Sequence, residues 1–198
     1  QNRSAASLKD LLAVKIADLD RNITHLQAVR ETLCTHHQNM VTLLTMDLSK
    51  IDIIEKKERC LVTVDIDKDT SFEQEVEMIT AETIKYQLGR LHQASYGSMI
   101  SVASLQSGNY DDYSRLFIEI PFLPSKEGLH IQPGGKYLRA FHKGDWDRMP
   151  LRYQAILDYA ARQGLVLSGY AYEMGINENV IDQINDYIVQ IEIPILAY

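Results

Sequence analysis

The first forty residues carry apolar side chains at alternating spacings of four and three. Five residues follow this spacing: Leu12, Ile16, Leu19, Ile23 and Leu26. Such a stripe is the heptad seam of a coiled coil, and it is narrower than the apolar face of a helix buried in a globular core. Neither glycine nor proline interrupts residues 7–39. We therefore expect residues 1–50 to form a long dimerising helix; a helix lying on the rest of the same chain is the alternative.

Residues 55–124 change to short segments rich in β-branched residues, with one helical pattern among them. The expected elements are a strand at 59–66, a helix at 71–93, and strands at 96–105 and 113–122. Ser71 is a candidate N-cap of the helix, with Gln74 three residues later as in a capping box. The predicted order is β-α-β-β.

Residues 127–198 repeat this order. The expected elements are a strand at 136–144, a helix at 148–164, and strands at 165–174 and 186–196. Pro150 is tolerated in the first turn of the helix and Gly164 ends it. Both units contain the sequence Ile-Glu-Ile-Pro in their last strand, starting at Ile118 and at Ile191. This repeat indicates a tandem duplication.

The pattern thus predicts an α+β fold, in which a coiled-coil helix precedes a duplicated β-α-β-β domain at 55–198. Two such units can pair their antiparallel sheets about a pseudo-two-fold axis and leave a ligand cleft between them.

Composition and charge narrow the function classes. The chain of 22.6 kDa has a formal net charge of -7, a sequence pI near 5.3 and two cysteines without a CxxC spacing. An acidic chain is a poor ligand for DNA phosphates. The sequence has no apolar run long enough to span a membrane and no basic-then-apolar leader. We expect a cytoplasmic protein with reduced thiols and no membrane partner.

Motifs for cofactors and metals are missing from the sequence. It contains no nucleophile elbow, zinc-protease motif, P-loop or dinucleotide fingerprint, so no cofactor is expected. Cys34, His36 and His37 lie within four residues of one another without a second pair elsewhere, which is not the spacing of a structural zinc site. We expect no metal site.

The second unit resembles a known family. The segment PGGKYLRAFHKGDW resembles that family's Pro-x-Gly-x-Tyr and His-x-Gly-x-aromatic motifs, and GYAYEMG resembles its Gly-x3-Glu-x-Tyr motif. The matching residues are Gly135, Tyr137, His142, Gly144, Trp146, Gly169 and Glu173. Gly175 departs from the pattern, because the family usually has tyrosine there. The chain resembles the GyrI-like effector-binding domain with the preceding dimerisation helix of a multidrug-sensing MerR-type transcriptional regulator.

This resemblance implies a ligand site with one acid and an aromatic wall. Glu173 would attract a cation as a partly desolvated strand carboxylate, or else face solvent at the end of a strand. The expected ligand-binding residues are Glu173, Tyr137, Trp146, Tyr170, Tyr172, Tyr187, Tyr96 and Phe117. For each ring taken singly, core packing is an equal alternative. His142 is expected to be structural.

The resemblance also implies a function. The chain would be the ligand-sensing and dimerisation part of a regulator, binding a small amphipathic or cationic effector as a homodimer. The sequence opens at Gln1 without methionine, and we expect DNA binding to belong to an N-terminal winged helix-turn-helix domain outside it. The alternatives are a stand-alone GyrI-like ligand- or protein-binding module and a hydrolase of strained electrophiles, with Glu173 as base and Tyr137 as hydrogen-bond donor.

Overall fold

The computed structural model describes residues 4–85, 96–119, 128–177, 180–181 and 183–196. The chain divides into two compact units, Gln1–Met46 and Asp47–Tyr198. Among the described residues, no helix combines the length and the apolar composition of a membrane span.

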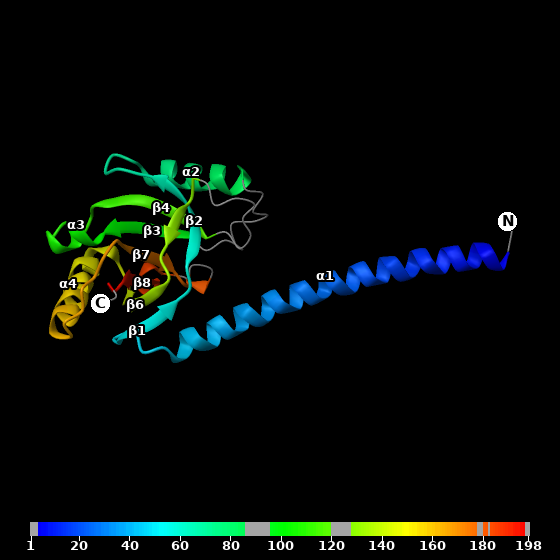
Figure 1. Ribbon diagram of the computed structural model, residues 1–198, viewed down its shortest axis with the longest axis horizontal. Helices are drawn as coiled ribbons and strands as arrows, with labels where there is room; N and C mark the ends of the chain where they lie inside the picture. The colour runs from blue at the N-terminus through cyan, green and yellow to red at the C-terminus, as the bar shows by residue number, and fades with distance from the viewer. Residues whose placement is uncertain (1–3, 86–95, 120–127, 178–179, 182, 197–198) are drawn as a thin grey trace. The chain divides into compact units, whose positions relative to one another are not determined.

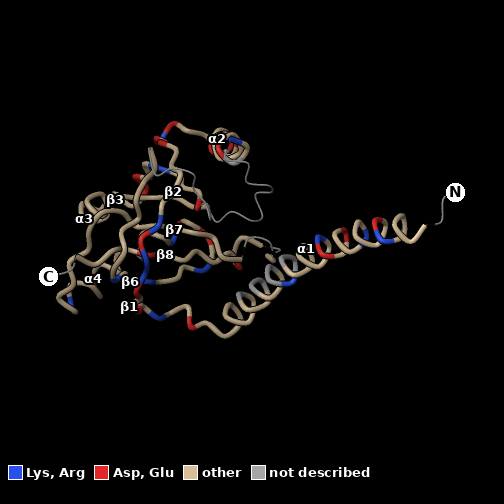
Figure 2. The backbone as a smooth tube through the Cα atoms, turned by 45° about the vertical axis from the view of Figure 1, so that its right-hand side comes forward, with Lys and Arg blue, Asp and Glu red and all other residues tan. Residues whose placement is uncertain are grey.

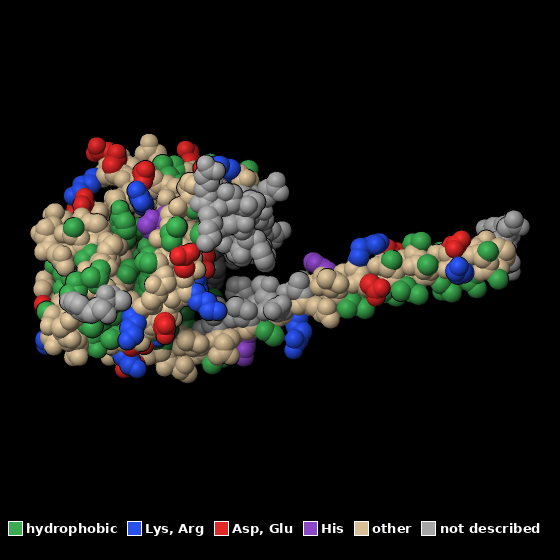
Figure 3. All heavy atoms as spheres, viewed as in Figure 1, with side chains coloured by type: hydrophobic (Ala, Val, Ile, Leu, Met, Phe, Trp, Pro, Cys, Tyr) green, Lys and Arg blue, Asp and Glu red, His purple; other side chains and the backbone are tan. Residues whose placement is uncertain are grey.

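Helix α1 runs without interruption over Ala5–Thr45, which confirms the long helix expected from the sequence. The Ser4 side chain caps it by accepting a hydrogen bond from the Ser7 amide, 3.2 Å away. At 1.5 Å per residue the helix is about 60 Å long. Its charged residues lie mostly in the first half (Figure 2), and apolar side chains are exposed along its length (Figure 3).

The second unit contains one antiparallel sheet in the order β1-β6-β8-β7-β3-β4-β2-β5. The strands are β1 (Ile51–Lys56), β2 (Arg59–Asp65), β3 (Tyr96–Ser101), β4 (Tyr113–Glu119), β5 (His130–Gln132), β6 (Gly135–Lys143), β7 (Tyr170–Gly175) and β8 (Ile188–Pro194). The α+β class is confirmed. The two expected sheets are the two halves of this one sheet, joined where β3 pairs with β7.

The two halves are related by an internal pseudo-symmetry and exchange their first strands. The order β2-β4-β3 in one half corresponds to β6-β8-β7 in the other. Strand β1, which precedes β2 in the chain, pairs with β6 of the other half, and β5, which precedes β6, pairs with β2. This exchange places the end of β1 beside the second half.

Three described helices pack on one face of the sheet (Figure 1). They are α2 (Phe72–Lys85), α3 (Val102–Gln106) and α4 (Met149–Arg162), and two short 3-10 helices, η2 (Trp146–Arg148) and η4 (Ile184–Asp186), lie in loops. Helix α2 packs on β2 and β4, and α4 packs on β6. Helix α3 contacts β3 and shares one apolar cluster with α4. The capping box of α2 is present, since Ser71 and Gln74 exchange two hydrogen bonds of 2.8 and 3.4 Å.

Several predicted boundaries were wrong. The strand expected at 96–105 ends at Ser101, because the Ser101 side chain caps α3 by accepting from the Ser104 amide at 2.9 Å. The strand expected at 165–174 begins at Tyr170, because Gly169 has a φ of +70° that breaks an extended chain. The ends expected at 86–93 and 120–122 lie outside the described residues.

Candidate functional site

Alternation along the strands gives the sheet two different faces. The helix face carries the side chains that pack against α2, α3 and α4. The opposite face, here called the pocket face, carries a separate apolar cluster. Its buried members are Leu61, Met99, Phe117, Tyr137 and Tyr172. Because these residues come from β2, β3, β4, β6 and β7, both halves of the sheet build the pocket face.

A small pocket opens on this face. Residues from both halves line it, among them Lys56, Arg59, Phe117, Glu119, Tyr172 and Glu192. Its free volume is about 10 Å³, which is about one water molecule, whereas pockets for small organic ligands hold hundreds of Å³. The protein's own side chains therefore fill it, and a larger ligand has to displace at least one of them.

Glu192 is the buried acid of the pocket. Its side chain is 6% exposed and forms an ion pair with Lys56, whose side chain is 12% exposed. The Gln190 amide donates a hydrogen bond of 2.9 Å to the other carboxylate oxygen. A buried carboxylate is stable only with partners of this kind.

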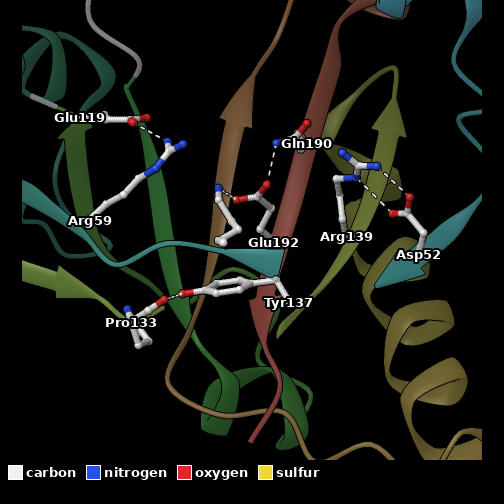
Figure 4. Close-up of polar contacts among 9 residues, drawn as sticks. Asp52, Arg59, Glu119, Pro133, Tyr137, Arg139, Gln190 and Glu192 are labelled. Carbon is white, nitrogen blue, oxygen red and sulfur yellow. Dashed lines mark hydrogen bonds and ion pairs between the residues drawn. The ribbon is translucent and has the colours of Figure 1, made fainter. Parts of the chain in front are cut away.

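Two further ion pairs lie on either side of Glu192 (Figure 4). Arg139 binds Asp52 in a bidentate way, through bonds of 3.1 and 2.7 Å, and Arg59 pairs with Glu119. Glu119 and Glu192 are the glutamates of the two Ile-Glu-Ile-Pro segments. The repeat thus places one acid from each half on the pocket.

Aromatic rings supply the apolar walls. Phe117 and Tyr172 meet edge to face, with ring centroids 5.9 Å apart. The Tyr172 hydroxyl bonds to the ring of His130 at 2.9 Å, and the Tyr137 hydroxyl donates to the carbonyl of Pro133 (Figure 4). Burial raises the pKa of both tyrosines, and that of Tyr137 is raised further by the charge of Glu192. The rings are therefore neutral, fixed surfaces on which a flat or cationic group can stack.

Glu173, the acid expected from the sequence, lies on the helix face and is 3% exposed. The Tyr113 hydroxyl lies 2.9 and 3.1 Å from its two oxygens, and the Tyr153 hydroxyl of α4 also donates to it. Burial raises the pKa of Glu173 to about 7, although these two hydrogen bonds oppose the shift. No ion pair with Glu173 is present among the described residues.

The structure thus brings together only part of the expected ligand site. Tyr137, Tyr170, Tyr172 and Phe117 share the pocket face, while Glu173 lies on the other face of the sheet. The remaining expected residues lie apart from the pocket: Trp146 of η2 packs on Tyr187 of the helix-face core at 5.0 Å, and Tyr96 is exposed at the start of β3, in register with Ile118. His142 donates from Nε2 to the Asp145 carbonyl in the turn that follows it.

Sequence reasoning missed the charged residues of the pocket. Glu192 stands in a strand whose other side chains are almost all buried, and an acid in such a strand is a signal of a partner. That partner, Lys56, lies 136 residues away in the chain. Only the exchange of β1 between the halves brings the two together, and local pattern does not show it.

Solved structures with this fold are known. The EcmrR C-terminal domain superposes with a TM-score of 0.57 at 14% identity, over 77% of this chain and 100% of that chain. This chain has the fold of that domain. EcmrR in a complex with DNA matches 100% of this chain and 75% of its own, with a TM-score of 0.54 and 13% identity. The fold-level resemblance drawn from the sequence is therefore confirmed.

A protein named as a hydrolase has the same fold. A hydrolase from Listeria innocua has a TM-score of 0.51 at 12% identity, over 78% of this chain and 96% of that chain. No protein-family model matches the sequence, and no curated protein sequence matches it. At these identities the comparisons establish the fold alone.

Proposed function

We propose that this chain is the effector-sensing and dimerisation part of a MerR-type transcriptional regulator. Its pocket face binds a small amphipathic effector that carries a positive charge. The observation that carries this proposal is the buried Glu192 carboxylate, set among aromatic rings in a pocket that both halves of the sheet build.

The chemistry of the pocket favours a cation with apolar bulk. A carboxylate in a poorly solvated site attracts positive charge more strongly than the same group in water. The faces of Tyr137 and Tyr172 add a favourable cation–π surface and bury apolar area. A neutral apolar compound could stack on the rings but would make no ionic contact with Glu192.

Dimerisation through α1 follows from its apolar stripe. The unit Gln1–Met46 is a single helix, so it contains no element of its own that could cover the seam residues. Leu12, Ile16, Leu19, Ile23 and Leu26 are each more than half exposed in the single chain. A second copy of the helix offers a complementary seam.

DNA binding is assigned to a domain other than these residues. The acidic chain lacks the clustered positive charge that phosphate contacts need. EcmrR occurs in a DNA complex, and a quarter of that chain has no counterpart here. Occupancy of the pocket would be passed to such a domain through α1, in the cytoplasm. A stand-alone ligand-binding module is the simpler alternative.

The hydrolase alternative has less support from the geometry. It requires Glu173 as base and Tyr137 as hydrogen-bond donor at one substrate, and these side chains lie on opposite faces of the sheet. They cannot both contact one small substrate. This arrangement of side chains favours binding over catalysis.

A matched pair of ligands tests the proposal. N-methylacridinium and acridine have nearly the same flat shape, but in mildly alkaline buffer only the first is charged. Calorimetric titration of the chain should show binding of the cation at least about tenfold tighter than of the neutral compound, since one desolvated charge contact is lost in the second case. Equal affinity for both, or no binding of either, would overturn the proposal.

A further inference from the structure

Resting on the proposed function, we propose that Lys56 is an internal competitor for the effector. In the free protein its ammonium group occupies the position on Glu192 that the ligand's positive charge takes, and the effector binds by displacing it. The pocket would thus be closed by a cation of the protein itself.

The geometry around Glu192 points to this role. One carboxylate oxygen is held by the Gln190 amide at 2.9 Å, and the other takes the Lys56 ammonium. The same ammonium lies 5.9 Å from the centroid of the Tyr137 ring, within the range of a cation–π contact. A carboxylate together with an aromatic face is what a cation receptor offers to a lipophilic amine or ammonium compound, and here both elements are engaged by one lysine.

The ion pairs around Glu192 determine which ligand charge the pocket favours. Arg139 is balanced by Asp52 and Arg59 by Glu119. When Lys56 withdraws, the only charge left without a partner in this network is the carboxylate of Glu192. A ligand with a single positive charge restores neutrality, whereas a second charge would meet no free acid in the described pocket. The pocket therefore favours monocations.

Lys56 is placed so that it can leave. It is the last residue of β1 and is followed by a short connection to β2, which begins at Arg59. Its four-carbon stem can carry the ammonium out to solvent without loss of the strand. Since the lysine lines the pocket, its withdrawal also enlarges a volume that is otherwise too small for an organic ligand.

Competition of this kind lowers the observed affinity. If the state with Lys56 withdrawn is populated at between about 1 and 10%, the apparent dissociation constant is raised by about 10- to 100-fold over the intrinsic value. The lysine then acts as a threshold, and only compounds that combine a cation with enough apolar area displace it.

Lysine labelling of the wild-type chain tests the displacement directly. The Lys56 side chain is only 12% exposed, whereas its neighbour Lys57 is exposed. Acylation by an amine-reactive ester, followed by mass spectrometry, should show slow labelling of Lys56 and fast labelling of Lys57 in the free protein. Saturating N-methylacridinium should increase the rate at Lys56 by at least about fivefold and leave Lys57 unchanged. A bound cation with no change at Lys56, or with greater protection of it, would overturn the inference.

Affinity gives the second test. Lys56→Met keeps the length of the stem and removes the competitor, so it should bind N-methylacridinium at least about tenfold tighter than wild type. Lys57→Met is the matched control and should bind as wild type does. If wild type binds the cation and Lys56→Met binds it no better, this inference fails while the proposed function stands. If neither protein binds it, the proposed function fails, and the inference with it.

Discussion

At the scale of the residue, the buried acids Glu192 and Glu173 lie on opposite faces of one sheet and have different partners. Glu192 is paired with an ammonium group and an amide, whereas Glu173 accepts hydrogen bonds from two tyrosine hydroxyls. The cation beside Glu192 offsets the cost of burying its carboxylate. A carboxylate held only by neutral donors is costly to ionise, and for this reason its pKa rises.

The free energy of unfolding should depend on pH because of the raised pKa of Glu173. Its folded-state pKa of about 7 lies above the ordinary value of 4.5, so between these values the folded protein holds a proton that the unfolded chain has lost. The stabilisation is complete below about pH 4.5 and is lost as the pH rises through about 7. The free energy of unfolding should fall by an amount on the order of 3 kcal/mol over this window.

Denaturant titrations at several pH values measure this slope. Glu173→Gln cannot ionise and should flatten the curve between about pH 5 and 7.5. Glu77→Gln, which changes an exposed acid on α2, serves as the matched control and should keep the wild-type slope. An unchanged slope in Glu173→Gln would show that this carboxyl ionises as an ordinary one does.

At the scale of the element, one arginine joins α4 to the segment that leads into β1. Arg152 donates from Nη2 to the carbonyl oxygens of Leu48, Ser49 and Lys50, at 3.2, 3.5 and 3.2 Å. A guanidinium group is suited to several acceptors at once. The contact fixes the start of β1, the strand that ends in Lys56.

Loss of this contact should loosen residues 47–56 locally. Arg152→Gln should cost about 2 kcal/mol of stability, because three carbonyls lose a charged donor. Hydrogen–deuterium exchange should become faster at 47–56 and stay unchanged in β7 and β8. Arg162→Gln, at an exposed position of the same helix, is the control. Equal exchange in both variants would count against the proposed anchor.

The central strand pair leaves no room for a side chain at Gly97. A Cβ there would lie 1.9 Å from the backbone oxygen of Glu173 and 2.8 Å from the Phe117 ring. Gly97→Ala should therefore force β3 away from β7, at a cost of about 2 kcal/mol or more in the free energy of unfolding. Thermal unfolding measures it, and a melting temperature equal to wild type would show that the two strands can separate freely.

The sequence was sufficient for the repeat and its helices but not for the pairing of faces. The capping residues and the two Ile-Glu-Ile-Pro strands predicted the α+β class and the β-α-β-β core of each half, but β1, α3 and β5 were not predicted. Which side chains share a face depends on strand parity, and a shift of one residue moves a whole strand's pattern to the other side. Glu173 and Tyr137 match one family motif set, yet they lie on opposite faces. Lys56 could not be predicted as the partner of Glu192, because the two meet only through the pairing of β1 with β6, which local propensity does not encode.

At the scale of the whole molecule, we propose that the unit Asp47–Tyr198 senses the ligand and that the unit Gln1–Met46 associates two copies. The apolar seam on α1 is the only feature proposed for pairing two copies, and its residues are exposed in the single chain. In a dimer, one pair of α1 helices would connect two units that each carry a pocket.

Oligomeric state tests this division. We expect the wild-type chain to be a dimer in light scattering. Leu19→Asp places a charge in the middle of the seam and should make the chain monomeric, since a buried unpaired charge costs several kcal/mol. Val14→Asp, an equally exposed position off the seam, should remain dimeric. A dimer that survives Leu19→Asp would place the association elsewhere in the chain.

The central claim is that the effector's charge is received on the pocket face. A calorimetric comparison of Glu192→Gln with Glu173→Gln, both titrated with N-methylacridinium, tests it most directly. We expect Glu192→Gln to weaken binding by at least about tenfold and Glu173→Gln to bind as wild type does, because only the first removes a charge from the pocket. The reverse order of affinities would move the site to the helix face and contradict the account.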